Sequence, residues 1–266
     1  MSFGLLIVGD EILSGKREDK HLAKFIEMLS DRGLTLKWAH YVGDDREAIT
    51  EFLRRSMNSN DIVFSTGGIG ATPDDHTRQA AAAAAEVPIR RHPEAVRLIT
   101  ERANEMAAQK GLPTPVDMNS DENRQRLAMA DFPLGCEIVP NPFNKIPGFS
   151  VGQHYFVPGF PVMAWPMIEW VLDTKYRHLF HQGQESERSI IVFDVYEAQL
   201  TPLMESIERQ HQGIKVFSLP SVGDDKVPRH IELGVKGQSE RVDEAYRDLI
   251  SGLQRFSPRF GAELRR

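Results

Sequence analysis

A run of apolar residues that ends in a glycine-rich loop occupies residues 61–77, which read DIVFSTGGIGATPDDHT. The run from Asp61 to Ser65 predicts a strand. The three glycines that follow let the backbone turn tightly and approach a ligand without a Cβ in the way. Backbone amides in such a loop can bind an anion, so this segment is either a phosphate-binding loop or only a tight turn. These glycines are Gly67, Gly68 and Gly70.

The residues after this loop predict a helix start. Thr72 and Asp75 have the spacing of a capping box, and Pro73 suits the first position of a helix. An alanine-rich helix through about Glu86 is expected to follow.

Two similar units precede this one along the chain. Residues 3–8 form a continuous apolar run, and apolar residues then recur at helical spacing up to Gly33. Residues 34–42 alternate loosely as a second strand, and Asp44 and Asp45 precede a further helix. Three strand–helix units in series predict an α/β fold, with a mostly parallel sheet and helices on both faces.

The pattern changes after a polar break at residues 181–186. We therefore expect two domains, residues 1–180 and residues 181–266. The second domain is predicted to be a small α+β module with the element order βαββα. Residues 112–150 contain six prolines, which favours a functional loop in the first domain.

Composition excludes several classes of protein. The chain has 266 residues and a net charge of −6. Its hydrophobic fraction of 41% is typical of globular proteins, which excludes collagen-like and wholly disordered chains. The acidic balance argues against nucleic-acid binding, and we expect no membrane partner. A single cysteine, Cys136, cannot form an internal disulfide, so a cytoplasmic location is expected.

Acidic residues gather at the predicted carboxyl ends of the strands, where open α/β sheets bind ligands. They could hold a hard divalent ion such as Mg²⁺ beside a phosphate, or they could be first-turn acids that favour helix starts. Their charge calls for a compensating cation, for which Lys16, Lys20 and Lys145 are candidates. The aromatic residues Phe160, Trp165 and Trp170 are interpreted as core or oligomer-interface residues. The acidic set is Asp10, Glu11, Asp44, Asp45, Asp74 and Asp75.

Four motifs together resemble the molybdopterin-binding (MoCF) domain family. They are GDEILSG at residues 9–15, VGDD at 42–45, TGGIGATPDDHT at 66–77 and VPGFP at 157–161. The chain is most similar to the N-terminal part of CinA proteins, and less so to the MogA and MoaB enzymes of molybdenum-cofactor synthesis. It looks like a stand-alone form without the deamidase domain of CinA. It departs from the CinA pattern at His21 and Asp45, where Asn is usual.

The resemblance implies a three-layer α/β/α sandwich, a KH-like C-terminal module and a homo-oligomer, either a dimer or a trimer. It implies a small phosphorylated ligand, molybdopterin or a nucleotide such as ADP-ribose. By motif, the catalytic and metal-binding carboxylates fall on Asp44 and Asp75. The substrate-binding positions are Gly9, Asp10, Glu11, Gly15, Thr66, Gly67, Gly68, Gly70, Asp74, Thr77, Pro158 and Gly159.

Two functions remain open from the sequence. The first is a metal-dependent hydrolase of a phosphoanhydride such as that of ADP-ribose, with Asp44 and Asp75 holding Mg²⁺ or a similar ion. The second is a non-catalytic module that binds molybdopterin or a nucleotide.

Overall fold

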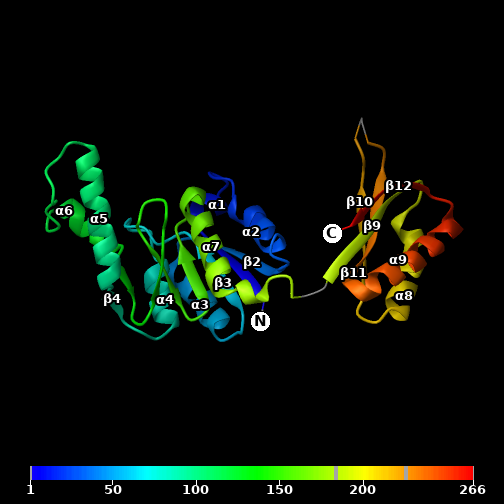
Figure 1. Cartoon of the computed structure of the whole chain (residues 1–266), viewed down its shortest axis with the longest axis horizontal. Coiled ribbons are helices and arrows are strands. Elements are labelled where there is room, and N and C mark those ends of the chain that lie inside the picture. The colour runs from blue at the N-terminus through cyan, green and yellow to red at the C-terminus, as the bar shows by residue number, and fades with distance from the viewer. Residues whose placement is uncertain (1, 183–184, 225–226, 266) are drawn as a thin grey trace. The chain divides into compact units, whose positions relative to one another are not determined.

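The structure is a computed structural model, and it describes residues 2–182, 185–224 and 227–265. The chain divides into two compact units, residues 1–180 and residues 181–266 (Figure 1). Residues 183 and 184 of the predicted polar break lie outside the described residues.

The N-terminal unit is built on a six-stranded sheet with the order β2-β1-β3-β8-β7-β6. The first four strands of this order run parallel, and β7 is antiparallel to both of its neighbours. This confirms the predicted mostly parallel sheet. The strands are β1 (Phe3–Val8), β2 (Leu36–Val42), β3 (Ile62–Thr66), β6 (Glu137–Val139), β7 (Gly148–Val151) and β8 (His154–Val157).

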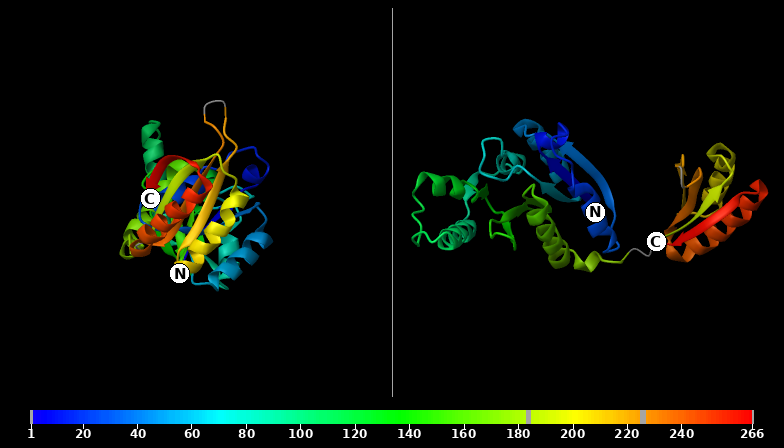
Figure 2. Two further views of the ribbon diagram at one scale, coloured as in Figure 1. Left: turned by 90° about the vertical axis from the view of Figure 1, so that its right-hand side faces the viewer. Right: turned by 90° about the horizontal axis from the view of Figure 1, so that it is seen from above.

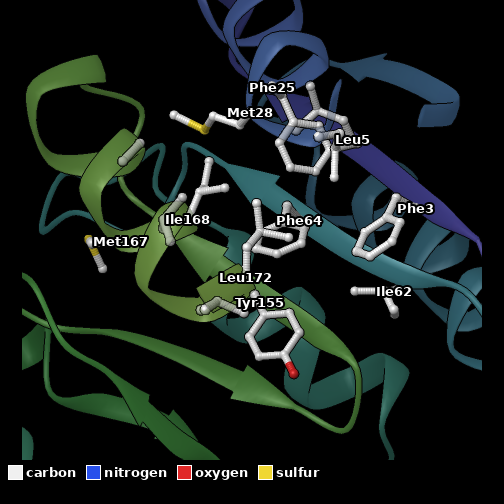
Figure 3. Close-up of a cluster of buried hydrophobic side chains, with 14 of the residues drawn as sticks. Phe3, Leu5, Phe25, Met28, Ile62, Phe64, Tyr155, Met167, Ile168 and Leu172 are labelled. Carbon is white, nitrogen blue, oxygen red and sulfur yellow. The ribbon is translucent and has the colours of Figure 1, made fainter. Parts of the chain in front are cut away.

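Successive side chains of a strand point to opposite sides of the sheet, so the apolar strands present an apolar surface on each face. Helices cover both of these faces. Phe3, Leu5 and Ile7 of β1 pack with α2 and α7, in the cluster drawn in Figure 3. Leu6 and Val8 pack on the other face with α3, α4 and α5. The result is the three-layer sandwich that the resemblance implied. The helices are α1 (Asp10–Leu13), α2 (His21–Ser30), α3 (Arg46–Met57), α4 (Thr77–Ala84), α5 (Pro93–Gln109), α6 (Asp121–Ala128) and α7 (Pro161–Lys175), followed by a 3-10 turn at Arg177–Leu179.

The proline-rich segment 112–150 has more regular structure than the sequence predicts. It contains α6, β6 and β7, and also β5 (Asp131–Pro133), which pairs with β4 (Ile89–Arg91). The prediction of one irregular loop was wrong, because strands of three or four residues are too short to show a period.

The C-terminal unit is a four-stranded antiparallel sheet in the order β10-β11-β9-β12, packed with α8 and α9 around one apolar core (Figure 2). The predicted βαββα order is present, and a further strand at the C-terminal end pairs with β9. The elements are β9 (Glu185–Phe193), α8 (Glu197–Gln210), β10 (Lys215–Ser221), β11 (His230–Gln238), α9 (Ser239–Leu253), a 3-10 turn (Gln254–Phe256) and β12 (Arg259–Arg265).

Candidate ligand-binding site

A cavity of about 780 Å³ lies at the carboxyl ends of the parallel strands in the N-terminal unit. The loops that follow β1, β2, β3 and β8 all contribute to its lining. This is where open α/β sheets bind ligands, because loops from neighbouring strands converge there. The predicted site residues that line it are Gly9, Glu11, Asp44, Thr66, Gly67, Gly68, Gly70, Asp74, Asp75, Pro158 and Gly159.

The glycine loop after β3 has a backbone that side chains other than glycine would strain. Gly67 and Gly68 have φ angles of +98° and +68°. A Cβ on Gly67 would lie 2.2 Å from the carbonyl oxygen of Val8, and one on Gly68 would lie 2.2 Å from Thr77 Oγ1. The glycines are therefore required by both conformation and space.

Thr77 holds this loop in place through two hydrogen bonds. Its hydroxyl donates to the Gly67 carbonyl at 3.0 Å, and its amide donates to the Gly68 carbonyl at 3.0 Å. In the part of the chain that the structure describes, the amides of Gly68 and Gly70 have no hydrogen-bond partner. The Gly67 and Gly68 carbonyls are thus bonded within the protein, and amides left without a partner in a loop of this kind could bind an anion.

The helix after the loop begins later than predicted. Helix α4 starts at Thr77, and residues 72–75 form a turn instead of its first residues. The predicted pairing of Thr72 with Asp75 does exist, because Asp75 Oδ2 accepts from the amide of Thr72 at 2.8 Å and from its hydroxyl. The two residues close a turn because the glycine loop, held by Thr77, sets the helix start.

Asp44 is surrounded by other carboxylates. Its Oδ2 accepts from the amide of Asp10 at 2.9 Å, and Asp10 Oδ1 accepts from the amide of Asp44 at 3.2 Å. Partial burial raises the pKa of Asp44, and the charges of Asp10, Glu11 and Asp74 raise it further. Like charges held together at a partly buried position favour a bound cation or a proton.

The carboxylates at the cavity could hold a divalent ion only together with a ligand. Among the residues that the structure describes, no three His, Cys, Asp or Glu side chains come together as a metal cage. Mg²⁺ is commonly bound through one or two carboxylates, with water and substrate phosphates as the remaining ligands. Asp44 and Asp75, which both line the cavity, could supply those carboxylates.

Three predicted binding residues do not line the cavity: Asp10, Gly15 and Thr77. Asp10 instead fixes Asp44, and Thr77 is fully buried beneath the glycine loop. Gly15 has a φ angle of +71° in the turn after α1.

Of the three candidate lysines, Lys20 lines the cavity and Lys16 does not. Lys145 does not line the cavity, although its neighbours Asn144 and Ile146 do, and it forms ion pairs with Glu101 and Glu105 of α5. The prediction of Lys145 as a cation for the ligand was therefore wrong, because two carboxylates of α5 already pair with it.

Several lining residues were not predicted. Phe160 lines the cavity and is 53% exposed, so it is not a core residue, while its place in an oligomer interface stays a prediction. Arg17 lies over its ring, 5.6 Å from the centroid. Other lining side chains that were not predicted as site residues include Ile12, His21, Met129, Asn144, Ile146 and Met163.

Two buried polar atoms belong to residues that line the cavity. His21 Nε2 donates to the carbonyl of Gly159 at 2.9 Å, since a carbonyl can only accept, while His21 Nδ1 has no partner among the described residues. Thr66 Oγ1 is likewise buried without a partner there. Unsatisfied buried polar atoms are uncommon and often mark functional positions.

Comparison with known proteins places this fold in a family. Residues 4–178 match the family described as a probable molybdopterin binding domain. A crystal structure of CinA from Thermoplasma acidophilum, described as of unknown function, aligns with 26% identity and a TM-score of 0.54. It covers 65% of this chain and 98% of that one. No helix within the described ranges is both long and apolar enough to cross a membrane.

The relatives differ in how much of their length the chain covers. A protein of Caldivirga maquilingensis is 27% identical over 96% of this chain and 97% of its own length. A CinA-like protein of Anaeromyxobacter sp. (strain Fw109-5) is 33% identical over 88% of this chain but 58% of its own length. One from Anaeromyxobacter dehalogenans (strain 2CP-C) is covered over 40% of its length. With four matching motifs and this domain match, the chain belongs to the probable molybdopterin-binding domain family, as a CinA-like member.

Proposed function

We propose that the chain binds a phosphorylated pterin or nucleotide in the carboxyl-end cavity and hydrolyses a phosphoanhydride such as that of ADP-ribose. The observation that carries the proposal is the glycine loop. Its carbonyls are held by Thr77, and the amides of Gly68 and Gly70 have no partner within the described chain. Amides fixed in this way bind phosphate oxygens without reorganising.

The size and chemistry of the cavity support a ligand of this kind. A volume of about 780 Å³ lies within the range for nucleotide-sized ligands. The lining includes polar groups from the glycine loop and the carboxylates, and also the apolar side chains of Ile146, Met163 and Phe160. A molecule with both phosphates and a planar heterocycle matches these two kinds of group.

The proposed reaction is addition of water across one P–O bond of the pyrophosphate, which gives AMP and ribose 5-phosphate from ADP-ribose. A divalent ion at Asp44 and Asp75 would neutralise phosphate oxygens. Asp44 is suited to hold a cation or orient the water, because it stands beside Asp10, Glu11 and Asp74. The loop amides would stabilise charge on the phosphate oxygens.

One observation favours the non-catalytic alternative. Asp75 Oδ2 already accepts two hydrogen bonds from Thr72, which can be a purely structural role. In that case the chain would bind its ligand without turnover, and chelation of divalent ions would leave binding unchanged.

Calorimetry with ADP-ribose and an assay of AMP release in Mg²⁺, Mn²⁺ or Co²⁺ distinguish the hydrolase from the non-catalytic binding module. Binding with metal-dependent AMP release supports the hydrolase, and binding that is unaffected by EDTA, without AMP, supports the module. A wild-type protein that binds neither ADP-ribose nor a phosphorylated pterin contradicts both.

A further inference from the structure

We propose that Phe160 is the platform on which the planar heterocycle of the ligand stacks, and that Arg17 binds the ligand's phosphates after leaving the ring face. The inference rests on the proposed function and identifies which side chains at the cavity recognise each part of the ligand.

The first observation is that Phe160 is exposed at a cavity. Phe64 and Phe156 of the same unit are fully buried in the core, whereas Phe160 is 53% exposed and lines the cavity. Apart from the imidazole of His21, it is the one aromatic ring among the described residues that line the cavity. An aromatic face in a cleft offers stacking to any planar ring.

The second observation is that the backbone holding this ring is fixed before any ligand arrives. Pro158 and Pro161 flank it, and the Phe160 carbonyl accepts from the amide of Ala164 at 2.8 Å in the first turn of α7. The preceding carbonyl, of Gly159, accepts from His21 Nε2, which joins segments 138 residues apart in the chain. A pre-organised platform binds a ring with a small loss of entropy.

The cavity lining carries more acidic than basic side chains. Of the side chains that line the cavity, five are acidic and only two, Arg17 and Lys20, are formally basic. A pyrophosphate ligand therefore depends on these two for charge compensation within the lining. The acidic residues are Glu11, Glu18, Asp44, Asp74 and Asp75.

Arg17 is placed to change partners. Its guanidinium lies over the Phe160 ring at 5.6 Å from the centroid and 3.9 Å from Glu11 Oε1, with the side chain 60% exposed. Exposed ion pairs and exposed cation–π contacts are weak, so a stacking heterocycle can displace the guanidinium. A released guanidinium is suited to phosphate because it donates two parallel hydrogen bonds.

The test compares two probes by calorimetry. ADP-ribose carries both a heterocycle and a phosphoanhydride, while inorganic pyrophosphate carries only the latter. We expect Phe160→Leu to weaken ADP-ribose binding roughly 10-fold, the usual size of one lost base stack, and to leave pyrophosphate binding unchanged. Phe160→Trp should bind ADP-ribose about as tightly as the wild type. Arg17→Gln should weaken the binding of both probes roughly 10-fold.

Phe143→Leu is the matched control, because Phe143 is 58% exposed and lies outside the cavity lining. Equal weakening of both probes by Phe160→Leu, or no weakening of either, overturns the inference while the proposed function stands. If Arg17→Gln leaves pyrophosphate binding unchanged, its assigned role is overturned. Wild-type protein that binds neither probe contradicts the proposed ligand class and the inference together.

Discussion

The two ends of the parallel sheet in the N-terminal unit differ in how their polar groups are used. At the carboxyl end, loop amides and buried side-chain atoms such as His21 Nδ1 and Thr66 Oγ1 have no partner among the described residues, and a cavity of about 780 Å³ lies there. At the amino end, polar groups bond to one another. Asp61 accepts from Trp38 Nε1 at 2.9 Å and from the Ser2 hydroxyl, and His154 Nε2 bonds to Ser56 Oγ at 2.8 Å.

The candidate ligand-binding groups thus lie at one end of the sheet, and the paired polar groups lie at the other. Paired polar groups at the amino end stabilise the unit, while under the proposed function the unpaired groups at the carboxyl end would bind a ligand. Changes at the carboxyl end should therefore affect binding and turnover, and changes at the amino end should affect unfolding.

The largest effect is expected at Asp44. Asp44→Asn should lower the rate of AMP release from ADP-ribose about 100-fold or more, because a charge that acts on the reacting phosphates is lost. Stability should be nearly unchanged, since the substitution also removes repulsion from Asp10, Glu11 and Asp74. Glu47→Gln, an exposed residue in the first turn of α3, is the control. Full activity in Asp44→Asn would show that the acidic cluster has no catalytic part.

At the amino end, His154 should make stability depend on pH. Burial lowers the pKa of His154 to about 4, from an ordinary value near 6.5. Between these two values the unfolded chain binds a proton that the folded chain does not, so stability falls as pH falls from about 6.5 to about 4. The total loss is about 3 kcal/mol. Urea unfolding across this range should show the loss in the wild type, and His154→Gln should flatten it. Equal slopes in both proteins would remove His154 as the cause.

Substitutions at two glycines distinguish the cost of backbone strain from the cost of steric crowding. Gly68 and Gly111 have φ angles of +68° and +66°, but only Gly68 has atoms where a Cβ would stand. Gly111→Ala should cost about 1 kcal/mol of unfolding free energy for the left-handed backbone alone. Gly68→Ala should cost roughly 1 kcal/mol more through contact with Thr77, and should also weaken pyrophosphate binding. Equal stability losses, with binding intact, would mean that the loop tolerates a side chain.

The smallest expected effect is at Asp61. Asp61→Ala removes the acceptor for Trp38 and Ser2 and should destabilise the unit by about 1 kcal/mol, without changing ligand affinity. Urea unfolding measures the stability of this variant, and calorimetry on the same sample measures its ligand affinity. A loss of ligand affinity in this variant would break the separation between the two ends.

Local sequence patterns predicted the central sheet and much of the site. The strand from Ile62 to Thr66 is uniformly buried, and the Gly67 and Gly68 conformations depend on glycine itself, so both are visible in the sequence. Helix α4 was placed too early because the pairing of Thr72 with Asp75 closes a turn here as readily as it caps a helix.

Features that depend on contacts between distant segments could not be predicted in the same way. Phe160 faces the cavity in a loop that His21, far away in the chain, holds through Gly159. Arg17 has no motif of its own, and its role depends on where Phe160 lies. Strand β12 is mostly exposed and contains Gly261, so its sequence lacks the alternation that marks a strand.

The most direct test of the account is a crystal structure of the protein soaked with ADP-ribose and Mn²⁺. We predict phosphate density within hydrogen-bond distance of the amides of Gly68 and Gly70, with the ligand in the carboxyl-end cavity. Ligand density elsewhere on the molecule, with these amides bound to water alone, would contradict it.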